Sequence, residues 1–476
     1  MFDDVRKRWW ALYVLCSGVL MIVLDTTIVN VALPSIREDL EFTETSLVWV
    51  VNAYMLTFGG FLLLGGRLGD LFGHRKLFLV GLIAFTVASL GCGLAQTQFM
   101  LIVARALQGL GGAVVTAVAL SLIMDLFTET GERAKAMGIY GFVCSAGGSI
   151  GVLLGGFLTT TLNWHWIFLV NLPIGLAVYV ASTKLLPKDV PHSGGAKLDV
   201  AGAITVTASM MLAVYAIVNG EILGWSSTAV LVMLGIAAAL LLAFLVIESK
   251  VSHPLMPLGL FKRRNIAVAN VVGVLWAAAM FAWFFISALY LQLVLGYDAL
   301  RVGLCFLPAN LIMAAFSLGL SAKIVMKFGF RVPLFGGLIV AAAGLAWFAR
   351  APVDGHFWFD VLPGMTLLGI GAGVAFNPLL LGAMSDAGTE NSGLASGIMN
   401  TAFMMGGSLG LAILASVAAS RTESLHAAGA TTQVALNGGY QLAFVCGALA
   451  ATAAALLGGG LLRTRMDAAA PPMAPH

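Results

Sequence analysis

The chain has 476 residues, of which 60% are hydrophobic and 10% are charged, and its mean hydropathy is +0.98. A soluble domain carries about a quarter charged residues and about half apolar residues, so this composition excludes a soluble enzyme, a nucleic-acid-binding protein and a disordered protein. The net charge of +3 is too small to indicate an acidic partner. The five cysteines and seven histidines are scattered and show no metal-ligand spacing, so we expect neither a disulfide framework nor a metal site.

Fourteen apolar runs are long enough to cross a membrane. A crossing takes about 20 helical residues through about 30 Å of hydrocarbon, and backbone groups in lipid must be hydrogen-bonded within the helix. In chain order the predicted spans are 10–33, 47–66, 77–95, 99–126, 136–160, 164–185, 199–218, 227–247, 266–295, 302–322, 333–350, 357–382, 393–418 and 440–462. The sequence therefore predicts an all-α membrane protein.

The basic residues predict how these spans are oriented. With the N-terminus in the cytoplasm, 20 of the 25 Lys and Arg residues fall in inner segments, four fall in outer segments, and Arg105 lies within a span. Cytoplasmic loops carry such an excess of positive charge, so we expect both termini to be cytoplasmic. The loops are short and hold no GxxxxGK[ST] phosphate loop, so we expect no nucleotide-binding or catalytic domain.

Two segments of the chain resemble each other. Residues 136–151 and 395–410 match at seven of sixteen positions at an offset of 259, and Gly73 and Arg75 recur as Gly329 and Arg331 at an offset of 256. The simplest organisation is a six-helix bundle at 1–185, a linker at 186–265 with two inserted spans, a second bundle at 266–462 and a disordered cytoplasmic tail at 463–476. An offset of eight spans gives both bundles one orientation, as in secondary transporters with a midplane site between their repeats.

Five motifs carry a resemblance to a known family. They read LDTTIVNVALP at 24–34, GRLGDLFGHRK at 66–76, RALQGLGGA at 105–113, GGSIGVLLGG at 147–156 and WHWIFLVNLPIG at 164–175. Together they resemble the major facilitator superfamily, specifically the fourteen-span drug:proton antiporters, over essentially the whole chain. The resemblance implies the major facilitator fold, with two parallel six-helix pseudo-repeats plus two inserted helices, in a bacterial cytoplasmic (inner) membrane.

The chain departs from the family's pattern in four places. Leu71 stands where a basic residue is usual, Val152 where Pro is usual, and His165 where Arg is usual. Met404 and Met405 replace a usual Arg-Gln pair. The missing Pro bears on the direction of transport, because that motif separates exporters from uptake relatives.

Asp25 and Arg105 are the charged residues that lie deepest in the predicted spans. A carboxylate within a span costs about 2.5–3.5 kcal/mol, so such a residue is usually functional or paired, and protonation removes most of that cost. At about 1.5 Å per residue, the two residues lie at similar depths below the outer ends of their spans. We expect them to pair and to couple proton binding to transport, a role the resemblance also implies for Arg105. The alternative is an ion pair that only fixes helix packing.

Opposite charges in two inner loops predict a cytoplasmic gate. Charges after span 2 can meet charges after span 4 in one conformation and separate in another, and a glycine allows a tight turn there. The alternative is solvated surface charge of little energetic value. The candidate gate residues are Gly66, Asp70, Gly73, Arg75, Glu132 and Arg133.

Span 5 carries glycines at a spacing of four. Gly147, Gly151 and Gly155, with Gly156 beside them, present a bare face that another helix can approach closely. Packing is one interpretation and a bendable, proton-tight seam is another, and the two are compatible.

Span 9 presents an aromatic and methionine face formed by Trp276, Met280, Trp283 and Phe284. Such side chains suit flat hydrophobic ligands, and Trp binds cations over its ring, so this face is a candidate wall of the substrate cavity. The alternative is a lipid-facing or packing stripe. Further polar candidates for the cavity are Asn30, Asn52, Tyr54, Gln108, Asn310, Asn377 and Asn400.

The sequence favours proton-driven export of a hydrophobic drug, antibiotic or toxic metabolite by alternating access. The expected partners are the small molecule, protons and the lipid bilayer, with no nucleic acid and no cofactor, and we expect the monomer to be functional. The alternatives are a specific metabolite exporter or a proton-coupled importer of the same fold, and, in a different class, a membrane receptor or scaffold. No catalytic constellation indicates an enzyme.

Overall fold

The computed structural model describes residues 5–187, 199–252, 254–387 and 392–463. Within these ranges all regular secondary structure is helical. Thirteen helices of the described part are long and apolar enough to cross a membrane, and a shorter apolar helix completes the fourteen predicted spans. The chain is therefore a multi-pass membrane protein, as predicted.

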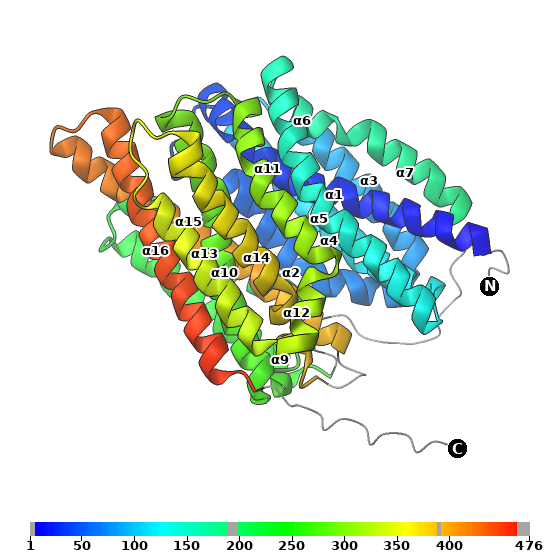
Figure 1. The fold of residues 1–476 in the computed structure, drawn as a ribbon. Helices are drawn as coiled ribbons and strands as arrows, with labels where there is room; N and C mark the ends of the chain where they lie inside the picture. Colours follow the sequence, from blue (N-terminus) through cyan, green and yellow to red (C-terminus); the bar gives the residue numbers. More distant parts are fainter. Residues whose placement is uncertain (1–4, 188–198, 253, 388–391, 464–476) are drawn as a thin grey trace.

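The helices form one elongated bundle of roughly aligned rods (Figure 1). The first half contains α1 (Val5–Asp39), α2 (Val48–Phe72), α3 (His74–Gly93), α4 (Gln98–Leu126), α5 (Thr130–Thr161), α6 (Trp166–Leu169) and α7 (Asn171–Leu185). The inserted pair is α8 (Val200–Leu223) and α9 (Thr228–Lys250).

The second half follows a short 3-10 helix, η1 (Leu258–Lys262). It contains α10 (Arg264–Leu289) with η2 (Tyr290–Val294), α11 (Ala299–Ala315) with η3 (Phe316–Leu320) and α12 (Ser321–Phe328), α13 (Arg331–Phe348), η4 (Phe357–Val361) with α14 (Leu362–Met384), α15 (Ser392–Ala427) and α16 (Thr432–Leu461). We call the end of the bundle that carries the starts of α1, α5 and α10 and the end of α16 the basic face.

The tenth predicted span, 302–322, is not a continuous α-helix. α11 gives way to the π-helical turn η3, and inside that turn Gly319 has φ 124°, which breaks the helix before α12 begins. A φ of this sign is strained for any residue with a Cβ atom. The predicted span is therefore present, with a kink that glycine allows and that hydropathy does not record.

The repeated glycines make equivalent contacts in the two halves. A Cβ atom placed on Gly151 would lie 2.9 Å from the Leu24 carbonyl oxygen in α1, and one on Gly410 would lie 2.4 Å from the Ala278 Cα atom in α10. The helix pair α1–α5 is thus matched by α10–α15, which explains why small residues recur at an offset of 259. The turn that follows the second helix of each half also repeats, since Gly73 and Gly329 have φ values of 97° and 69°.

The two halves meet closely between α5 and α11. A Cβ atom on Gly156 would lie 2.6 Å from the Ala299 carbonyl oxygen, so only glycine allows this approach. The Leu300 amide donates a hydrogen bond of 3.2 Å to the Thr160 hydroxyl nearby. These contacts lie at the end of the bundle opposite the basic face and hold the halves together there.

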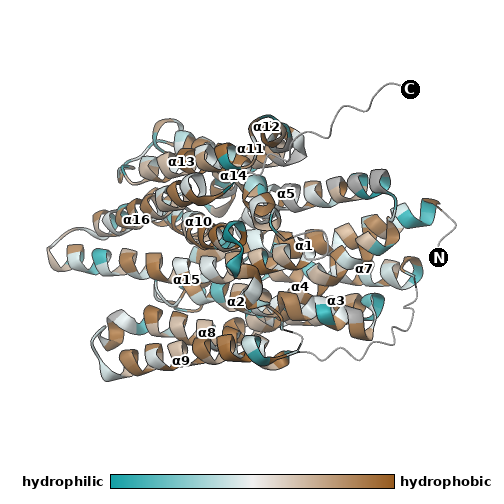
Figure 2. Cartoon of the chain, turned by 90° about the horizontal axis from the view of Figure 1, so that it is seen from below, coloured by the Kyte–Doolittle hydropathy of each residue, from teal (hydrophilic) through white to brown (hydrophobic). Residues whose placement is uncertain are grey.

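The inserted hairpin covers the seam between α2 and α15. α8 packs against both helices (Figure 2). Val206 of α8 joins a buried cluster with Met405 of α15. Only 17% of the most apolar stretch of α9 is buried in the protein. α9 therefore presents most of its surface to lipid, while α8 bridges the two halves.

The α5–α11 contact predicts a defined effect of one added methyl group. A T160C/L300C pair should oxidise to an intramolecular disulfide, because the Leu300 amide contacts the Thr160 side chain. Gly156→Ala should slow this cross-linking severalfold by pushing α11 away. The rate is read from the loss of thiols that react with a maleimide.

Gly148→Ala on the same helix is the matched control, because a Cβ atom there meets no atom within 4 Å. Both substitutions raise helix propensity by about 1 kcal/mol, so propensity cannot separate them. Equal cross-linking rates in the two variants would contradict the proposed close approach.

Candidate functional site

A buried ion pair joins α1 to α4. Arg105 Nη1 lies 2.6 Å from Asp25 Oδ2, and the side chains are 1% and 0% exposed. The prediction that these two residues meet at one depth is confirmed. A charge so deeply buried is tolerated only when it is paired and its remaining hydrogen-bonding atoms are satisfied.

Further polar groups complete the bonding of both charges. The Gln108 amide donates to Asp25 Oδ1 at 2.7 Å and accepts from Arg105 at 2.7 Å. Asn171 Nδ2, at the start of α7, donates to the same Asp25 oxygen at 3.0 Å. Ser89 of α3 accepts hydrogen bonds from both Gln108 and Asn171 at 2.6 and 3.2 Å.

Arg105 is also held by α2 and by aromatic rings. Its Nε donates to the Val50 carbonyl oxygen at 2.9 Å. The guanidinium lies 4.5 Å from the ring centroid of Tyr54 and 5.6 Å from that of Phe168. Flat aromatic faces attract a desolvated cation, so Arg105 keeps favourable contacts that do not depend on Asp25.

Ser89 and Asn171 were missing from the predicted site. Both are buried, at 0% and 1% exposed. Asn171 stands inside the WHWIFLVNLPIG motif, so its polarity within an apolar run was a usable signal. Ser89 gave none, because serine is common in membrane helices and bonds its own backbone there.

The charged network lies wholly within the first half, since its side chains come from α1, α3, α4 and α7 and its backbone acceptor from α2. α2 also leads to the second half. Two residues after Val50, the Asn52 amide donates to the Ser408 carbonyl oxygen of α15 at 3.0 Å. The Arg105 acceptor on α2 and the α2–α15 hydrogen bond are therefore only two residues apart.

The candidate gate residues are only partly brought together. Glu132 pairs with Arg8 of α1 at 3.1 Å, and Arg133 donates to the Phe127 carbonyl oxygen at 2.9 Å. Arg75 donates to the Thr183 carbonyl oxygen at 2.8 Å.

The described link between the turn after α2 and the end of α4 is formed by other residues. His74 Nδ1 lies 3.2 Å from Asp125 Oδ2. The side chain of Asp70 lies outside the described part. Gly66 faces Ala117 of α4, and Gly73 makes the turn. Glu132 forms an ion pair with Arg8, because α1 begins beside α5. The expectation that charges after α2 and after α4 meet in one conformation and separate in another stays a prediction.

The glycines of α5 face two different helices. Gly147, Gly151 and Gly155 lie against α1, and a Cβ atom on Gly155 would be 2.6 Å from the Ile28 carbonyl oxygen. Gly156 faces α11. The first three glycines pack α5 on the helix that carries Asp25, and Gly156 forms the contact between the halves.

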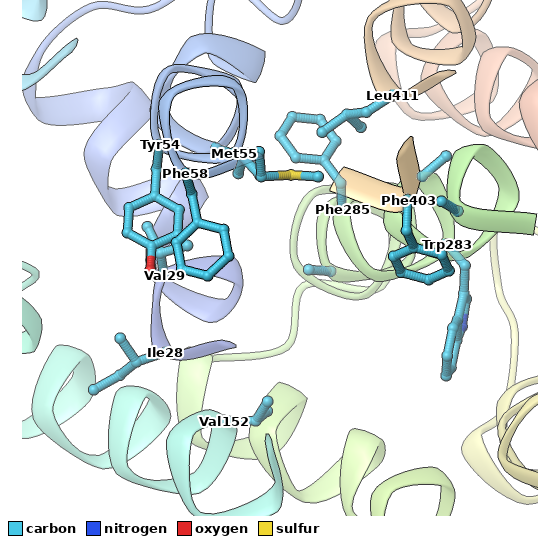
Figure 3. Packing of buried hydrophobic residues seen from close by; sticks show 14 of the residues in the cluster. Ile28, Val29, Tyr54, Met55, Phe58, Val152, Trp283, Phe285, Phe403 and Leu411 are labelled. Carbon is cyan, nitrogen blue, oxygen red and sulfur yellow. The ribbon is translucent and has the colours of Figure 1, made fainter. Parts of the chain in front are cut away.

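The aromatic face of α10 is buried rather than directed to lipid. Trp276 and Trp283 are 0% exposed, and neither indole N–H finds a hydrogen-bond partner among the described residues. Phe284 stacks on Phe306 of α11 with ring centroids 5.5 Å apart, while Met280 is half-buried. Figure 3 shows Trp283 on the opposite side of the same packed region from Tyr54.

The polar cavity candidates have different environments. Asn30 donates to the Thr26 carbonyl oxygen of its own helix at 3.4 Å, and Asn400 donates to that of Ser396 at 3.1 Å. Gln108 belongs to the ion-pair network and not to a cavity wall, because Asp25 takes its amide. The remaining candidates are Asn52, with an unbonded Oδ1, Tyr54, with an unbonded hydroxyl, Asn310, with an unbonded Nδ2, and Asn377, which is half-buried.

The candidate cavity residues are packed in this conformation. Met55 of α2, Gly407 of α15 and Phe281 of α10 meet where the halves join. A pocket of about 10 Å³ next to α14 is lined by Asn400 and Phe403. A larger pocket of about 600 Å³ lies between α8, α15 and α16, with Trp225 and Arg421 in its wall.

Relatives of known sequence are similar over nearly the full length. The chain is 37% identical over 471 residues to the puromycin resistance protein pur8 of Streptomyces alboniger, covering 97% of this chain and 93% of the relative. It is 38% identical over 417 residues to the cephamycin export protein CmcT of Amycolatopsis lactamdurans, covering 87% and 85%.

Solved structures share the fold at low sequence identity. The peptide transporter PepTSo of the POT family superposes with a TM-score of 0.68 at 16% identity, covering 96% of this chain and 98% of that one. The inward-open xylose transporter XylE from E. coli superposes with a TM-score of 0.64 at 14% identity, covering 97% and 98%. The family model described as Major Facilitator Superfamily matches residues 15–411. The chain therefore belongs to the major facilitator superfamily of membrane transporters.

Proposed function

We propose that this transporter exports amphipathic antibiotics from the bacterial cytoplasm in exchange for protons. The observation that carries the proposal is the buried Asp25–Arg105 pair, because the free energy of a carboxylate removed from water changes strongly when it takes up a proton. The relatives named for puromycin resistance and cephamycin export support antibiotic export.

Protonation of Asp25 removes the countercharge of Arg105. The guanidinium then keeps its bonds to Val50 and Gln108 and its contacts with the aromatic rings. Asp25 loses the ion pair and becomes a neutral group that α1 can carry past α4 at lower cost. The expected effect is a weaker attachment of α1 to the rest of the first half.

Protonation of Asp25 can affect the second half by two routes, one through α1 and α5 and the other through α2. α1 lies against the glycine stripe of α5, and α5 meets α11 at Gly156. In α2, the Val50 carbonyl oxygen accepts a hydrogen bond from Arg105, and the Asn52 amide donates one to α15. A shift of α1 or α2 therefore alters the contacts that hold the halves together, which is what alternating access needs.

In this proposal the basic face and both termini lie in the cytoplasm, and the distribution of Lys and Arg supports that orientation. The candidate residues of the cytoplasmic gate lie in the turn after α2 and at the start of α5. In this orientation a proton moving inward contributes about 2.3 kcal/mol per 100 mV of membrane potential. We expect one chain to be sufficient, because the site is complete within it.

The substrate binds between the halves, where unbonded polar atoms lie among aromatic rings. Trp276, Trp283 and Asn310 each bring an unpaired N–H group, and Asn52 an unpaired oxygen. Opening the halves would expose these groups to a ligand with hydrogen-bonding groups on a flat hydrophobic frame. A neutral or monovalent cationic compound fits best, because Asp25 is already paired with Arg105.

Asp25→Asn should abolish proton-driven export. The amide is close to the carboxyl in size but cannot exchange a proton, so the coupled step is lost. Proteoliposomes with an imposed pH gradient are supplied with puromycin, and drug flux and internal pH are followed together. The wild type should move drug and protons in opposite directions, and Asp25→Asn should lower both fluxes at least about tenfold, or about 1.4 kcal/mol in rate terms.

Glu423→Gln is the matched control, since Glu423 is an exposed carboxylate on α15, and it should transport normally. Drug and protons moving in the same direction would favour an importer. Undiminished uphill transport by Asp25→Asn would place the coupling elsewhere.

Arg105→Ala should destabilise the protein by about 3–5 kcal/mol, because it leaves Asp25 as an unpaired buried charge. Adding Asp25→Asn to that variant should recover part of the loss, since the amide carries no charge to leave unpaired. The free energy of unfolding in detergent is measured by circular dichroism for the wild type, the two single variants and the double variant. Strictly additive losses would show that the two side chains do not interact energetically.

A further inference from the structure

A second pair of buried carboxyl groups lies at the basic face, in the inserted hairpin. Asp199 immediately precedes α8 and Glu248 lies in the last turn of α9, and they are 4% and 3% exposed. Neither residue contacts the Asp25 network. Since buried carboxylates are costly unless they are compensated, this pair requires an explanation of its own.

Each carboxyl group has one oxygen that is hydrogen-bonded. Asp199 Oδ1 accepts from the Gly202 amide at 2.8 Å and so caps the start of α8. Glu248 Oε2 accepts from the Met256 amide at 2.9 Å and so fastens the segment that leads to η1 and the second half. One oxygen of each group is thereby accounted for.

The other two oxygens face each other without a donor. Asp199 Oδ2 and Glu248 Oε1 are both buried, and no described residue donates a hydrogen bond to either. A Cβ atom placed on Gly202 would lie 2.5 Å from the first and 3.0 Å from the second, and the two carboxyl groups are within hydrogen-bonding reach of each other. Two ionised carboxylates offer only acceptors, so a donor is missing between them.

Within the described part of the chain, no cation supplies that donor. Near this end the neighbouring described elements carry Arg67 on α2, Lys250 on α9, Lys262 on η1 and Arg263 directly after η1. Lys250, Lys262 and Arg263 are exposed, and the described ion pairs join none of these four cations to either carboxyl. The side chain of Asp70 on α2, and Lys188, His192 and Lys197 in the segment before Asp199, lie outside the described part. Residues 392–420 of α15 carry no charge.

We propose that Asp199 and Glu248 bind one proton between them, forming a carboxylic acid–carboxylate hydrogen bond that closes the basic-face end of the α8–α9 hairpin. Two carboxylates in a site of low dielectric cannot both be ionised without strong repulsion. One shared proton satisfies both unbonded oxygens and lowers the pair's charge from two to one. Loss of the proton drives the groups apart and releases Asp199 or Glu248 from its backbone donor.

The site places a proton-dependent contact on the linker between the halves. Glu248 holds Met256, and Leu255 beside it packs with Leu64 of α2 and Ala203 of α8. Alkalinisation at the basic face therefore loosens the hairpin from the seam that it covers. This inference is independent of proton-driven export and of Asp25.

Infrared difference spectroscopy tests the proposal on the full-length protein carrying Asp25→Asn, which removes the third buried carboxyl group of the described residues. Spectra are compared between about pH 6 and about pH 9, where exposed Asp and Glu remain ionised. A C=O band of a protonated carboxylic acid should be present at the lower pH, shift in D₂O and disappear as the pH rises.

Asp199→Asn and Glu248→Gln should each remove the band, whereas Glu423→Gln, at an exposed position, should leave it unchanged. Asp199→Asn retains a side chain that caps helices well, so it separates loss of the proton from loss of the fold. Absence of the band before any second substitution would overturn the proposal, as would its persistence in Glu248→Gln. Its removal by NaCl or MgCl₂ at constant pH would assign the site to a metal cation instead and would also overturn it.

Discussion

The structure depends on one carboxylate–guanidinium pair placed where water is absent. Asp25 and Arg105 are each almost completely buried, and every charged oxygen and nitrogen that they contribute to the pair is bonded within the first half. Loss of Arg105 would leave Asp25 as an unpaired buried charge, whereas Arg105 keeps its bonds to Val50 and Gln108 when Asp25 is neutral. The pair therefore constrains α1, α2, α3, α4 and α7 to one arrangement, and a proton on Asp25 is the simplest means of relaxing that constraint.

The two halves are alike in packing but differ in chemistry. Matched glycines pack α5 on α1 and α15 on α10, where Val23 and Thr27 correspond to Val274 and Ala278. That correspondence puts Trp276 where the first half has Asp25. The first half thus holds the titratable group and the second half holds buried aromatic donors, which separates proton binding from the proposed ligand surface. α2 and α15, covered by α8, connect the two functions.

Hydropathy and glycine spacing were sufficient to predict the spans and a close helix approach at span 5, since both are local properties of the chain, but they did not say which helix approaches. Asp25 and Arg105 were also predictable, because charges in apolar runs are rare and their depths could be compared. Ser89 and the Val50 carbonyl could not be predicted, since one is an ordinary helix residue and the other is backbone. The assignment of Gln108 to a cavity failed because its partner depends on how α1 and α4 are rotated, which hydropathy does not specify. The kink at Gly319 could not be predicted either, because a glycine with positive φ leaves no trace in hydropathy.

In the proposed cycle, drug binding and proton binding at Asp25 oppose each other, so that binding of drug releases the proton. The most direct measurement adds puromycin to purified transporter in weakly buffered detergent solution and follows a pH indicator. The account predicts release of about one proton per bound drug, as expected for a single coupled carboxyl, and no release from Asp25→Asn, even where the drug still binds. Equal proton release by the two proteins would contradict the account.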